Sequence, residues 1–336
     1  MSAWMRSGLV LLAAWPLGAC AGRQSALDPH ALQSADILRI FVAFLVVAAV
    51  VWIAVVVVLA VGLWRQPSLS RHPLALHPPF ERRAGQIVLG LGIATVLIVL
   101  ALSLVSYAGQ RSVFAKDPNA LTLKITGHQW WWEVSYEADS PHLSFVTANE
   151  IRIPVEQPVR VQLQSADVIH SFWIPSLTGK MDLITGQQNE IQFTAKRAGV
   201  YRGQCAEFCG LQHAHMAFAV IALPQDEFKR WRDHENQSAG SPVDPLSKRG
   251  EELFRARGCA LCHTVRGTLA GGQLGPDLTH FGSRTTIAAG TLPLNSASLG
   301  AWLADPQHIK PGNLMPQMAL QSDELIAIHH YLEQLK

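Results

Sequence analysis

The residues from Cys205 to Met216 combine the side-chain types that bind soft metal ions. Their sequence, CAEFCGLQHAHM, holds two cysteines, two histidines, a glutamate and a methionine, although the whole chain has only five cysteines in 336 residues. Thiolate, imidazole and thioether groups together suit copper. A blue-copper site on a β-sandwich needs two histidines, one cysteine and a weak axial methionine. Cys209, His213 and Met216 can supply three of these at loop spacing.

The second histidine and the second cysteine decide what kind of copper site this could be. His170, in the sequence ADVIHSFWIP, can supply the missing imidazole from another strand. Cys205 is not needed by one copper, and a second thiolate would allow two coppers to be bridged. Because cysteines outside the cell often form disulfides, a bond between Cys205 and Cys209 is the alternative.

The sequence CALCH predicts a covalently bound haem. Cys-x-x-Cys-His is the attachment pattern of c-type haem, so Cys259 and Cys262 would bond to the porphyrin and His263 would ligate the iron. A redox disulfide or half of a zinc site also uses Cys-x-x-Cys, but neither needs the histidine, and no further cysteine pair lies nearby. The other axial ligand should be a methionine or a histidine from further along the chain, since Met/His ligation raises the reduction potential, and IKPGNLMPQM offers Met315 and Met318.

Two long apolar stretches predict a membrane hairpin. The chain is 49% hydrophobic and only 15% charged, which is too apolar for an ordinary soluble protein. Residues 40–64 and 84–110 carry no charge, and each can cross the roughly 30 Å hydrocarbon core as a helix. The loop 65–83 holds four arginines against the single acid Glu81, so the positive-inside rule places it in the cytoplasm. Everything after Arg111 is therefore expected on the outer side of the membrane.

The N-terminus predicts export. Residues 1–19 combine Arg6, an apolar run and small residues, which is the layout of a signal peptide. The following Cys20 completes LGAC, which resembles a bacterial lipobox and predicts a lipidated cysteine. A plain signal peptide with a chance cysteine is the alternative. Residues 20–111 then form the N-terminal segment and the hairpin.

The part outside the membrane divides into two domains and a linker. Residues 117–232 contain short alternating stretches such as IRIPVEQPVRVQLQ, which predict an antiparallel β-sandwich. Residues 233–246 are rich in serine, proline and polar residues and read as a linker. Residues 247–336 change to helical patterns, and the last helix is expected to begin with Ser322 as its N-cap.

Three motifs together resemble cytochrome c oxidase subunit 2. They are Cys-x-Glu-x-Cys-x-x-x-His-x-x-Met, the upstream DVIHSFWIP, and the aromatic GHQWWWEVSY. The resemblance covers the hairpin and residues 117–232, and residues 247–336 resemble the cytochrome c that is fused to some bacterial members. It implies a cupredoxin-like Greek-key β-sandwich after the two-helix hairpin, followed by an all-α class I cytochrome c domain.

The resemblance implies a binuclear copper A centre and a role for each residue of its motif. His170 and His213 would each bind one copper, while Cys205 and Cys209 would bridge both. Met216 would be the axial ligand of one copper.

Further roles follow from the same resemblance. Glu207 would give its backbone carbonyl to the other copper, and its side chain would reach a magnesium shared with subunit 1. Trp130 matches the exposed tryptophan where electrons enter, and Asp167 matches a carboxylate that orients the site. PGNLMP selects Met315 as the axial haem ligand, with Met318 as the second choice. LGPDL would place Pro276 near the proximal histidine.

Two positions carry no role from the family. The family often begins its second membrane span with a carboxylate followed by Trp-Thr and a proline, whereas ERRAGQIVLG has only Glu81. A charge at the helix end is therefore favoured for Glu81 over proton uptake. His215 matches no functional position, and the remaining histidines are expected on the surface or in the core.

The resulting prediction is the subunit through which electrons enter a respiratory haem–copper oxidase. Electrons would pass from a donor through haem c and copper A to subunit 1, which reduces dioxygen. The expected partners are subunit 1, subunit 3, membrane lipid, and cytochrome c or an upstream quinol–cytochrome c reductase as donor, with no nucleic acid. The expected location is the bacterial inner membrane, crossed more than once, with both metal domains on the outer side. The alternatives are a copper A subunit of a nitric or nitrous oxide reductase, and a membrane-anchored copper-binding or chaperone lipoprotein.

Overall fold

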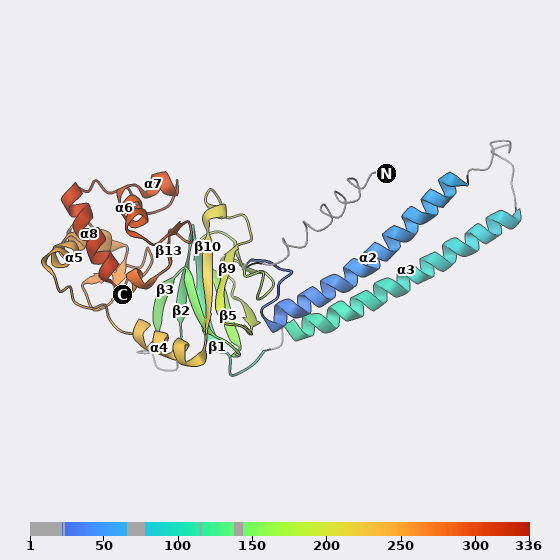
Figure 1. Ribbon diagram of the computed structural model, residues 1–336, viewed down its shortest axis with the longest axis horizontal. Helices are drawn as coiled ribbons and strands as arrows, with labels where there is room; N and C mark the ends of the chain where they lie inside the picture. The colour runs from blue at the N-terminus through green and yellow to red at the C-terminus, as the bar shows by residue number, and fades with distance from the viewer. Residues whose placement is uncertain (1–21, 23, 66–77, 114–115, 138–143) are drawn as a thin grey trace, which may run out of the picture. The chain divides into compact units, whose positions relative to one another are not determined.

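The computed structural model describes residues 22, 24–65, 78–113, 116–137 and 144–336. The chain divides into two compact units, Ala35–Ala115 and a second unit that combines Met1–Ser34 with Lys116–Lys336 (Figure 1). The expected signal peptide, 1–19, and Cys20 lie outside the described residues.

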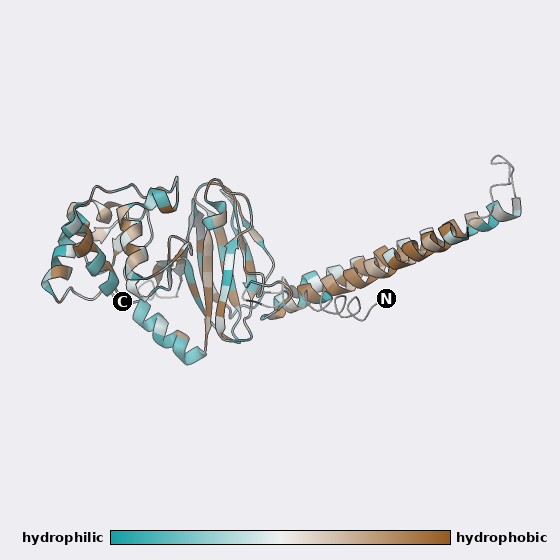
Figure 2. Ribbon diagram, turned by 45° about the horizontal axis from the view of Figure 1, so that its top comes forward, coloured by the Kyte–Doolittle hydropathy of each residue, from teal (hydrophilic) through white to brown (hydrophobic). Residues whose placement is uncertain are grey.

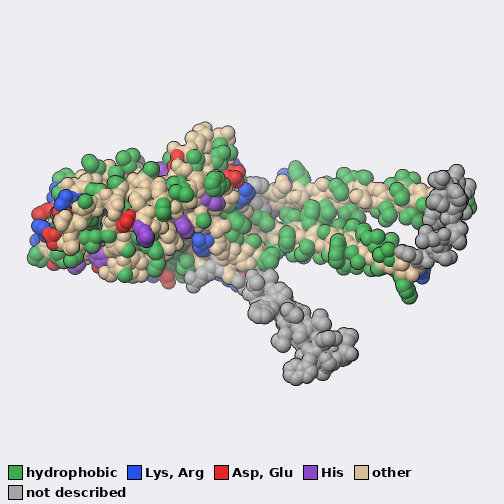
Figure 3. All heavy atoms as spheres, turned by 90° about the horizontal axis from the view of Figure 1, so that it is seen from above, with side chains coloured by type: hydrophobic (Ala, Val, Ile, Leu, Met, Phe, Trp, Pro, Cys, Tyr) green, Lys and Arg blue, Asp and Glu red, His purple; other side chains and the backbone are tan. Residues whose placement is uncertain are grey.

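Two long helices carry the apolar stretches. They are α2 (Leu32–Trp64) and α3 (Pro78–Val113), and both are long and apolar enough to cross a membrane. They begin earlier than the predicted 40–64 and 84–110, because each helix continues through polar residues before its apolar part. Hydrophobic residues run along both helices (Figure 2), and their side chains are exposed along most of the length of each (Figure 3). A Cβ added to Gly109 would lie 2.3 Å from Cδ1 of Ile40, so the two helices approach closely there.

The sandwich domain, residues 117–232, consists of two five-stranded sheets in the orders β3-β2-β1-β5-β8 and β4-β10-β9-β6-β7. Helix α4 (Gln225–Glu235) follows its last strand. The strands are β1 (Leu121–His128), β2 (Trp131–Tyr136), β3 (Phe145–Ala148), β4 (Glu150–Pro154), β5 (Val159–Ser165), β6 (His170–Trp173), β7 (Met181–Leu183), β8 (Asn189–Phe193), β9 (Gly199–Cys205) and β10 (Ala217–Leu223).

The sandwich is not wholly antiparallel, and in this detail the expectation was wrong. Strand β1 pairs in parallel with β5, and β4 pairs in parallel with β10, while the other paired strands are antiparallel. Alternation of apolar residues shows that a segment is a strand with one buried face, but it carries no information about the direction of its neighbour.

Aromatic rings fill the space between the two sheets. Trp132 is fully buried and meets Phe218 edge-on with ring centroids 5.1 Å apart, and Phe218 stacks on Phe172 at 4.7 Å. A Cβ on Gly203 would lie 2.2 Å from the Phe218 ring, so β9 needs a glycine there. The segment before α2 is tied to the same domain, because the His30 amide donates to the Ser176 carbonyl at 2.8 Å.

The C-terminal domain is built on helices that surround a second apolar core, and its first helix begins at Pro245, two residues before the predicted boundary at 247. The helices are α5 (Pro245–Ala256), α6 (Ser296–Ala304), α7 (Pro306–Ile309) and α8 (Ser322–Gln334). Short 3-10 turns and two-residue strands join them: Cys259–Leu261, β11 (Thr264–Val265), β12 (Ala270–Gly271), Phe281–Ser283, β13 (Thr286–Ile287) and β14 (Leu292–Pro293).

Helices α5 and α8 cross at a glycine. A Cβ on Gly250 would lie 2.1 Å from the carbonyl oxygen of Ala327, so this crossing excludes any side chain. The start of α8 differs from the expectation, since Gln321 is the N-cap and Ser322 is already helical. Gln321 and Glu324 form a reciprocal capping box, with the Gln321 amide donating to the Glu324 carboxylate at 2.9 Å.

Candidate metal centres

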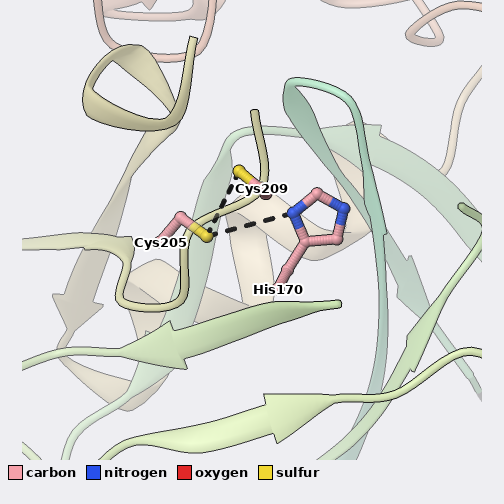
Figure 4. A group of neighbouring side chains, drawn as sticks. All are labelled: His170, Cys205 and Cys209. Carbon is pink, nitrogen blue, oxygen red and sulfur yellow. Dashed lines mark hydrogen bonds between the residues drawn. The ribbon is translucent and has the colours of Figure 1, made fainter. Parts of the chain in front are cut away.

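The predicted copper ligands meet at one end of the sandwich. His170 is the first residue of β6, and Cys205 is the last residue of β9. Cys209, His213 and Met216 follow in the loop that leads from β9 into β10. Figure 4 shows His170 and the two cysteines pointing toward one another from these elements. The sheet therefore fixes one histidine and one cysteine, while the loop brings the remaining groups to them.

The distances place two thiols between two imidazoles. The Sγ atoms of Cys205 and Cys209 are 3.7 Å apart. Nδ1 of His170 lies 3.9 Å from Sγ of Cys205, and Nδ1 of His213 lies 3.6 Å from Sγ of Cys209. Sδ of Met216 lies 3.8 Å from Sγ of Cys209. The cysteines lie in the middle, and each of the other groups approaches one of them.

The other end of the site is supplied by a backbone carbonyl. The carbonyl oxygen of Glu207 lies 3.2 Å from Sγ of Cys205, so it faces into the site. The Glu207 side chain points elsewhere, since its carboxylate lies 3.5 Å from Nζ of Lys180 and its side chain is 45% exposed. One residue thus offers a carbonyl to the site and a carboxylate to the surface.

Asp167 orients the buried histidine. Its Oδ1 lies 2.7 Å from Nε2 of His170, and its Oδ2 accepts from the backbone N–H of Gln129 at 2.7 Å. With Nε2 held by the carboxylate, His170 presents Nδ1 to Cys205. Burial opposes protonation of His170, but its hydrogen bonds to Cys205 and Asp167 outweigh this and raise its pKa.

The two thiols ionise unequally. A hydrogen bond from Cys209, followed by those of His170 and the Glu207 and Ser171 backbone, lowers the pKa of Cys205 to about 3 despite burial. The same hydrogen bond raises the pKa of Cys209, because its proton is shared with the Cys205 thiolate. A neighbouring metal would replace that shared proton, which makes both thiolates available as ligands.

The donor set fits two copper ions better than a disulfide. A disulfide has an S–S bond of about 2.05 Å, and the sulfurs are 3.7 Å apart here. All four cysteines in the described part of the chain are free. His170, Met216, Cys205 and Cys209 are buried, so the soft donors face one another without water.

The C-terminal domain encloses a cavity of about 360 Å³ with the haem-binding motif on its wall. Two apolar core side chains, Leu299 and Leu332, line it as well. The predicted haem residues that line it are Cys259, Cys262, His263, Met315 and Met318. An apolar cavity with two thiols, an imidazole and thioethers fits a covalently attached haem.

His263 is poised to bind a metal. Its Nδ1 lies 2.8 Å from the carbonyl oxygen of Pro276, so Nδ1–H donates there and the lone pair lies on Nε2. Burial lowers the pKa of His263 and keeps the imidazole neutral. A Cβ on Gly275 would lie 2.7 Å from Cε1 of His263, so the glycine leaves room for the ring.

The methionine segment is held by side-chain amides. Oδ1 of Asn313 accepts from the Met315 amide at 2.8 Å, and Nε2 of Gln307 donates to the Met315 carbonyl at 2.8 Å. Met315 also belongs to the apolar core of the domain, whereas Met318 only lines the cavity. The geometry thus brings both candidates to the cavity and anchors Met315 more firmly.

Trp130 lies between the two predicted metal centres. Its Nε1 donates to the Cys209 carbonyl at 2.9 Å, and its side chain also lines the cavity of the C-terminal domain. The expectation that this tryptophan is exposed was wrong, because only 9% of its surface is accessible. The physical reason is the C-terminal domain, whose Gly312 lies against the indole ring.

Sequence reasoning missed the residues that join the two domains. Glu150 and Lys310 are buried charged residues that each contact the other domain. Within the sandwich domain, sequence reasoning also missed Gln129, which donates to the Cys209 carbonyl beside Trp130 at 2.8 Å. None of them belongs to a metal-binding motif. The one sequence feature that could have pointed to this contact is the position of Lys310 in IKPGNLMPQM, the segment that also holds Met315.

Comparisons with known proteins identify the family. The family description "Cytochrome C oxidase subunit II, periplasmic domain" matches residues 139–223, and "Cytochrome c" matches residues 247–336. Cytochrome c oxidase subunit 2 of Alkalihalophilus pseudofirmus is 34% identical over 334 residues, which cover 95% of this chain and 94% of that protein. The chain belongs to the cytochrome c oxidase subunit 2 family.

One further relative agrees with this family, and one solved structure is similar to part of the chain. Cytochrome c oxidase subunit 2 of Bacillus subtilis is 36% identical over 257 residues, which cover 73% of this chain and 70% of that protein. A solved structure of the periplasmic domain of subunit II of cytochrome oxidase from Bradyrhizobium japonicum is 34% identical. It covers 35% of this chain and 95% of that chain, with a TM-score of 0.33.

Membership in this family confirms the predicted function. The chain is the subunit through which electrons enter a haem–copper oxidase, and neither the reductase nor the copper-chaperone alternative is favoured. Its subunit II domain implies copper A, and its cytochrome c domain implies haem. It is a membrane-anchored protein with a periplasmic domain and works in a complex with other oxidase subunits.

Proposed function

We propose that electrons reach the sandwich domain from the C-terminal domain of the same chain through Trp130. The observation that carries this proposal is the position of that indole, which lines the cavity beside His263 and donates to the Cys209 carbonyl at 2.9 Å. When bound, a covalent haem c and a copper pair supply one-electron carriers on the two sides of Trp130.

The C-terminal domain holds its haem through four residues. Cys259 and Cys262 would attach the haem covalently, and His263 and Met315 would ligate its iron. The Pro276 carbonyl fixes the His263 ring, and Asn313 fixes the Met315 backbone. Because the chain itself would supply both ligands of the iron, the bound haem would serve electron transfer rather than dioxygen binding.

The sandwich domain holds two coppers as a shared pair. Cys205 and Cys209 would supply thiolates to both ions, and the position of the two thiols between the two imidazoles supports this role. The terminal ligands are His170, His213, the Met216 thioether and the Glu207 carbonyl. Asp167 fixes the orientation of His170.

Glu207 also faces the partner subunit. Its carboxylate is at the surface, while its carbonyl faces the copper site. We assign this carboxylate to a magnesium site shared with subunit 1, since carboxylate oxygens suit Mg²⁺. Its neighbour Phe208 is 77% exposed, as expected for a side chain that a partner subunit covers.

The anchoring and the partners complete the proposal. Helices α2 and α3 both cross the inner membrane, with the loop 65–83 in the cytoplasm. Cys20 carries a lipid after removal of residues 1–19. Subunit 3 joins the complex, and the donor is cytochrome c or a quinol–cytochrome c reductase.

Metal analysis of the purified chain tests this function. We expect two coppers and one covalent haem per chain. Cys209→Ser should abolish the delocalised absorption of the copper pair and leave the haem spectrum intact, because Cys209 belongs to the sandwich domain only. Haem retention on a denaturing gel checks the covalent bond. One copper per chain, or a Cys205–Cys209 disulfide in the metal-loaded protein, would contradict the proposal.

A further inference from the structure

Two charged side chains are buried where the C-terminal domain meets the sandwich domain. Lys310 belongs to the C-terminal domain and Glu150 to the sandwich domain, and each is only 3% exposed. Both domains lie in the same compact unit of the chain. The two side chains do not pair with each other, and the carboxylate of Glu150 has its ion-pair partner, Arg152, in its own domain at 3.8 Å. Each reaches across to groups of the opposite domain.

Lys310 uses all its donors on backbone carbonyls. Its Nζ donates to the carbonyls of Trp130 at 2.7 Å, His215 at 2.8 Å and Ala288 at 3.0 Å. Burial lowers the pKa of Lys310 to about 7, but three acceptors require three N–H groups, which only the charged form has. The carbonyls of Trp130 and His215 belong to the sandwich domain, one beside the proposed electron path and one inside the copper loop.

Glu150 makes the reciprocal contact. Its Oε1 accepts from the amide of Thr285 at 2.6 Å, from the amide of Thr286 at 3.1 Å and from the Thr285 hydroxyl at 2.5 Å. Three donors of the C-terminal domain thus converge on one carboxylate oxygen of the sandwich domain. Charge-assisted hydrogen bonds of this kind are about twice as strong as neutral ones.

The backbone between these contacts has an uncommon conformation. Ala288 and Ala289 have φ values of 53° and 57°, in the left-handed region that non-glycine residues rarely adopt. The Ala288 carbonyl accepts from Lys310, and the Ala289 carbonyl accepts from the amide of Ala217 in the sandwich domain at 3.0 Å. This conformation therefore directs two successive carbonyls to Lys310 and to the Ala217 amide at the domain boundary.

Buried charges make this contact selective for one orientation. A charge removed from water is tolerated only where hydrogen bonds replace its hydration. Lys310 finds three acceptors and Glu150 finds three donors in the observed arrangement. A shift of the C-terminal domain would bury one or both charges without these partners, so other orientations are disfavoured.

The selected orientation encloses Trp130. A Cβ on Gly312 would lie 3.8 Å from the indole ring, so the segment between Lys310 and Met315 lies directly on Trp130. Nε2 of Gln212 adds a hydrogen bond to the Pro311 carbonyl at 2.7 Å beside it. An external donor consequently has no free access to this tryptophan.

We propose that Lys310 and Glu150 are positioning residues that lock the C-terminal domain onto the sandwich domain with Trp130 enclosed between them. The lock deepens the proposed function and rests on it, because it explains how one orientation between the two metal centres is maintained. It also directs an external electron donor to the C-terminal domain.

Backbone amide hydrogen exchange of the full, metal-loaded chain tests the lock. In Lys310→Met we expect exchange at Thr285 and Thr286, at the other contact, to accelerate about tenfold or more. Removal of a buried charged hydrogen-bonding group has roughly this effect on a docking equilibrium. In Glu150→Gln we expect hydrogen exchange to accelerate at the backbone amide of Ala217, which lies at the Lys310 contact. Lys248→Met removes an exposed lysine from the same domain and should leave all three amides unchanged.

Two further measurements separate the lock from other effects. Exchange in β5 and the haem and copper absorption should remain as in the wild type, which shows that both domains are still folded and loaded. Electron transfer from the reduced haem to the copper pair should slow in both variants. The lock would be overturned if exchange were unchanged both at Thr285 and Thr286 in Lys310→Met and at Ala217 in Glu150→Gln. A wild-type chain without copper or haem would instead overturn the proposed function, and the exchange result would still report the docking.

Discussion

Three adjacent tryptophans show how differently one residue type is used within this fold. Trp130 contacts the Cys209 carbonyl and lines the cavity of the C-terminal domain. Trp131 stacks on His128 with ring centroids 4.3 Å apart, and Trp132 fills the core of the sandwich. The sequence predicted Trp130 as the functional member by resemblance. The burial of Trp130 could not be predicted, because the segment around Gly312 that covers it lies far away in the chain.

The ligand residues were the most predictable part of the molecule. Cys205, Cys209 and His213 are close in the sequence, so their spacing already implied a common site. His170 required the fold, since only the pairing of β6 with β9 brings it to Cys205. The choice between Met315 and Met318 rested on resemblance, and both side chains line the cavity.

Substitution of each methionine tests the axial haem ligand. Met315→Leu should keep the haem, because Cys259 and Cys262 hold it covalently. It should lower the reduction potential by a measurable part of the roughly 0.8 V range that axial ligands span, and it should let external ligands bind the iron. Redox titration and binding of imidazole or cyanide measure both effects. Met318→Leu is the matched control, and a potential that falls only in this control would make Met318 the ligand.

At the scale of elements, long uncharged apolar stretches predicted the two long helices and alternating apolar residues predicted the strands, but neither pattern predicted how the strands pair. The alternation in residues 151–164 gave β4 and β5, whereas the parallel neighbours of both strands depend on the order in which distant segments meet. The predicted start of α8 was one residue off, because Gln321 is the N-cap and Ser322, the expected N-cap, is already helical. Local signals therefore located the elements better than their ends or their neighbours.

The crossing of α5 and α8 provides a prediction for an element contact. Gly250→Ala should destabilise the C-terminal domain by about 3 kcal/mol, because overpacking against the Ala327 carbonyl forces the helices apart. Gly300→Ala is the control in another helix of the same domain, where the added Cβ meets only His329 at 3.8 Å. It should be neutral or stabilise by up to about 1 kcal/mol, since alanine favours helices. Chemical unfolding followed through haem absorption measures both, and equal stability of the two variants would rule out a tight crossing.

At the scale of the whole molecule, the described part of the chain combines two electron-transfer domains with two helices that can span a membrane, and the sequences of these spans offer no ligands for a further metal centre. A haem inside the membrane needs axial ligands there, yet residues 40–64 and 84–110 contain no histidine, cysteine or methionine. They also hold no carboxylate or lysine that could carry protons through the bilayer. The apolar side chains of α2 and α3 are exposed, and their glycines, among them Gly90 and Gly92, leave open space where another helix can approach.

The chain alone should therefore accept electrons and consume no dioxygen. A reduced donor should reduce the haem and the copper pair of the chain, because each proposed centre lies in a domain on the outer side of the membrane, where the donor can reach it. Oxygen uptake should begin only when the larger membrane subunits are added, since they must supply the open coordination position that both proposed sites lack. An oxygen electrode measures this directly, with free haem and copper removed beforehand and the Cys209→Ser chain as a control that cannot pass electrons onward. Steady catalytic oxygen uptake by the purified single chain would mean that it holds an oxygen-reducing centre of its own, contrary to the closed coordination proposed for both sites.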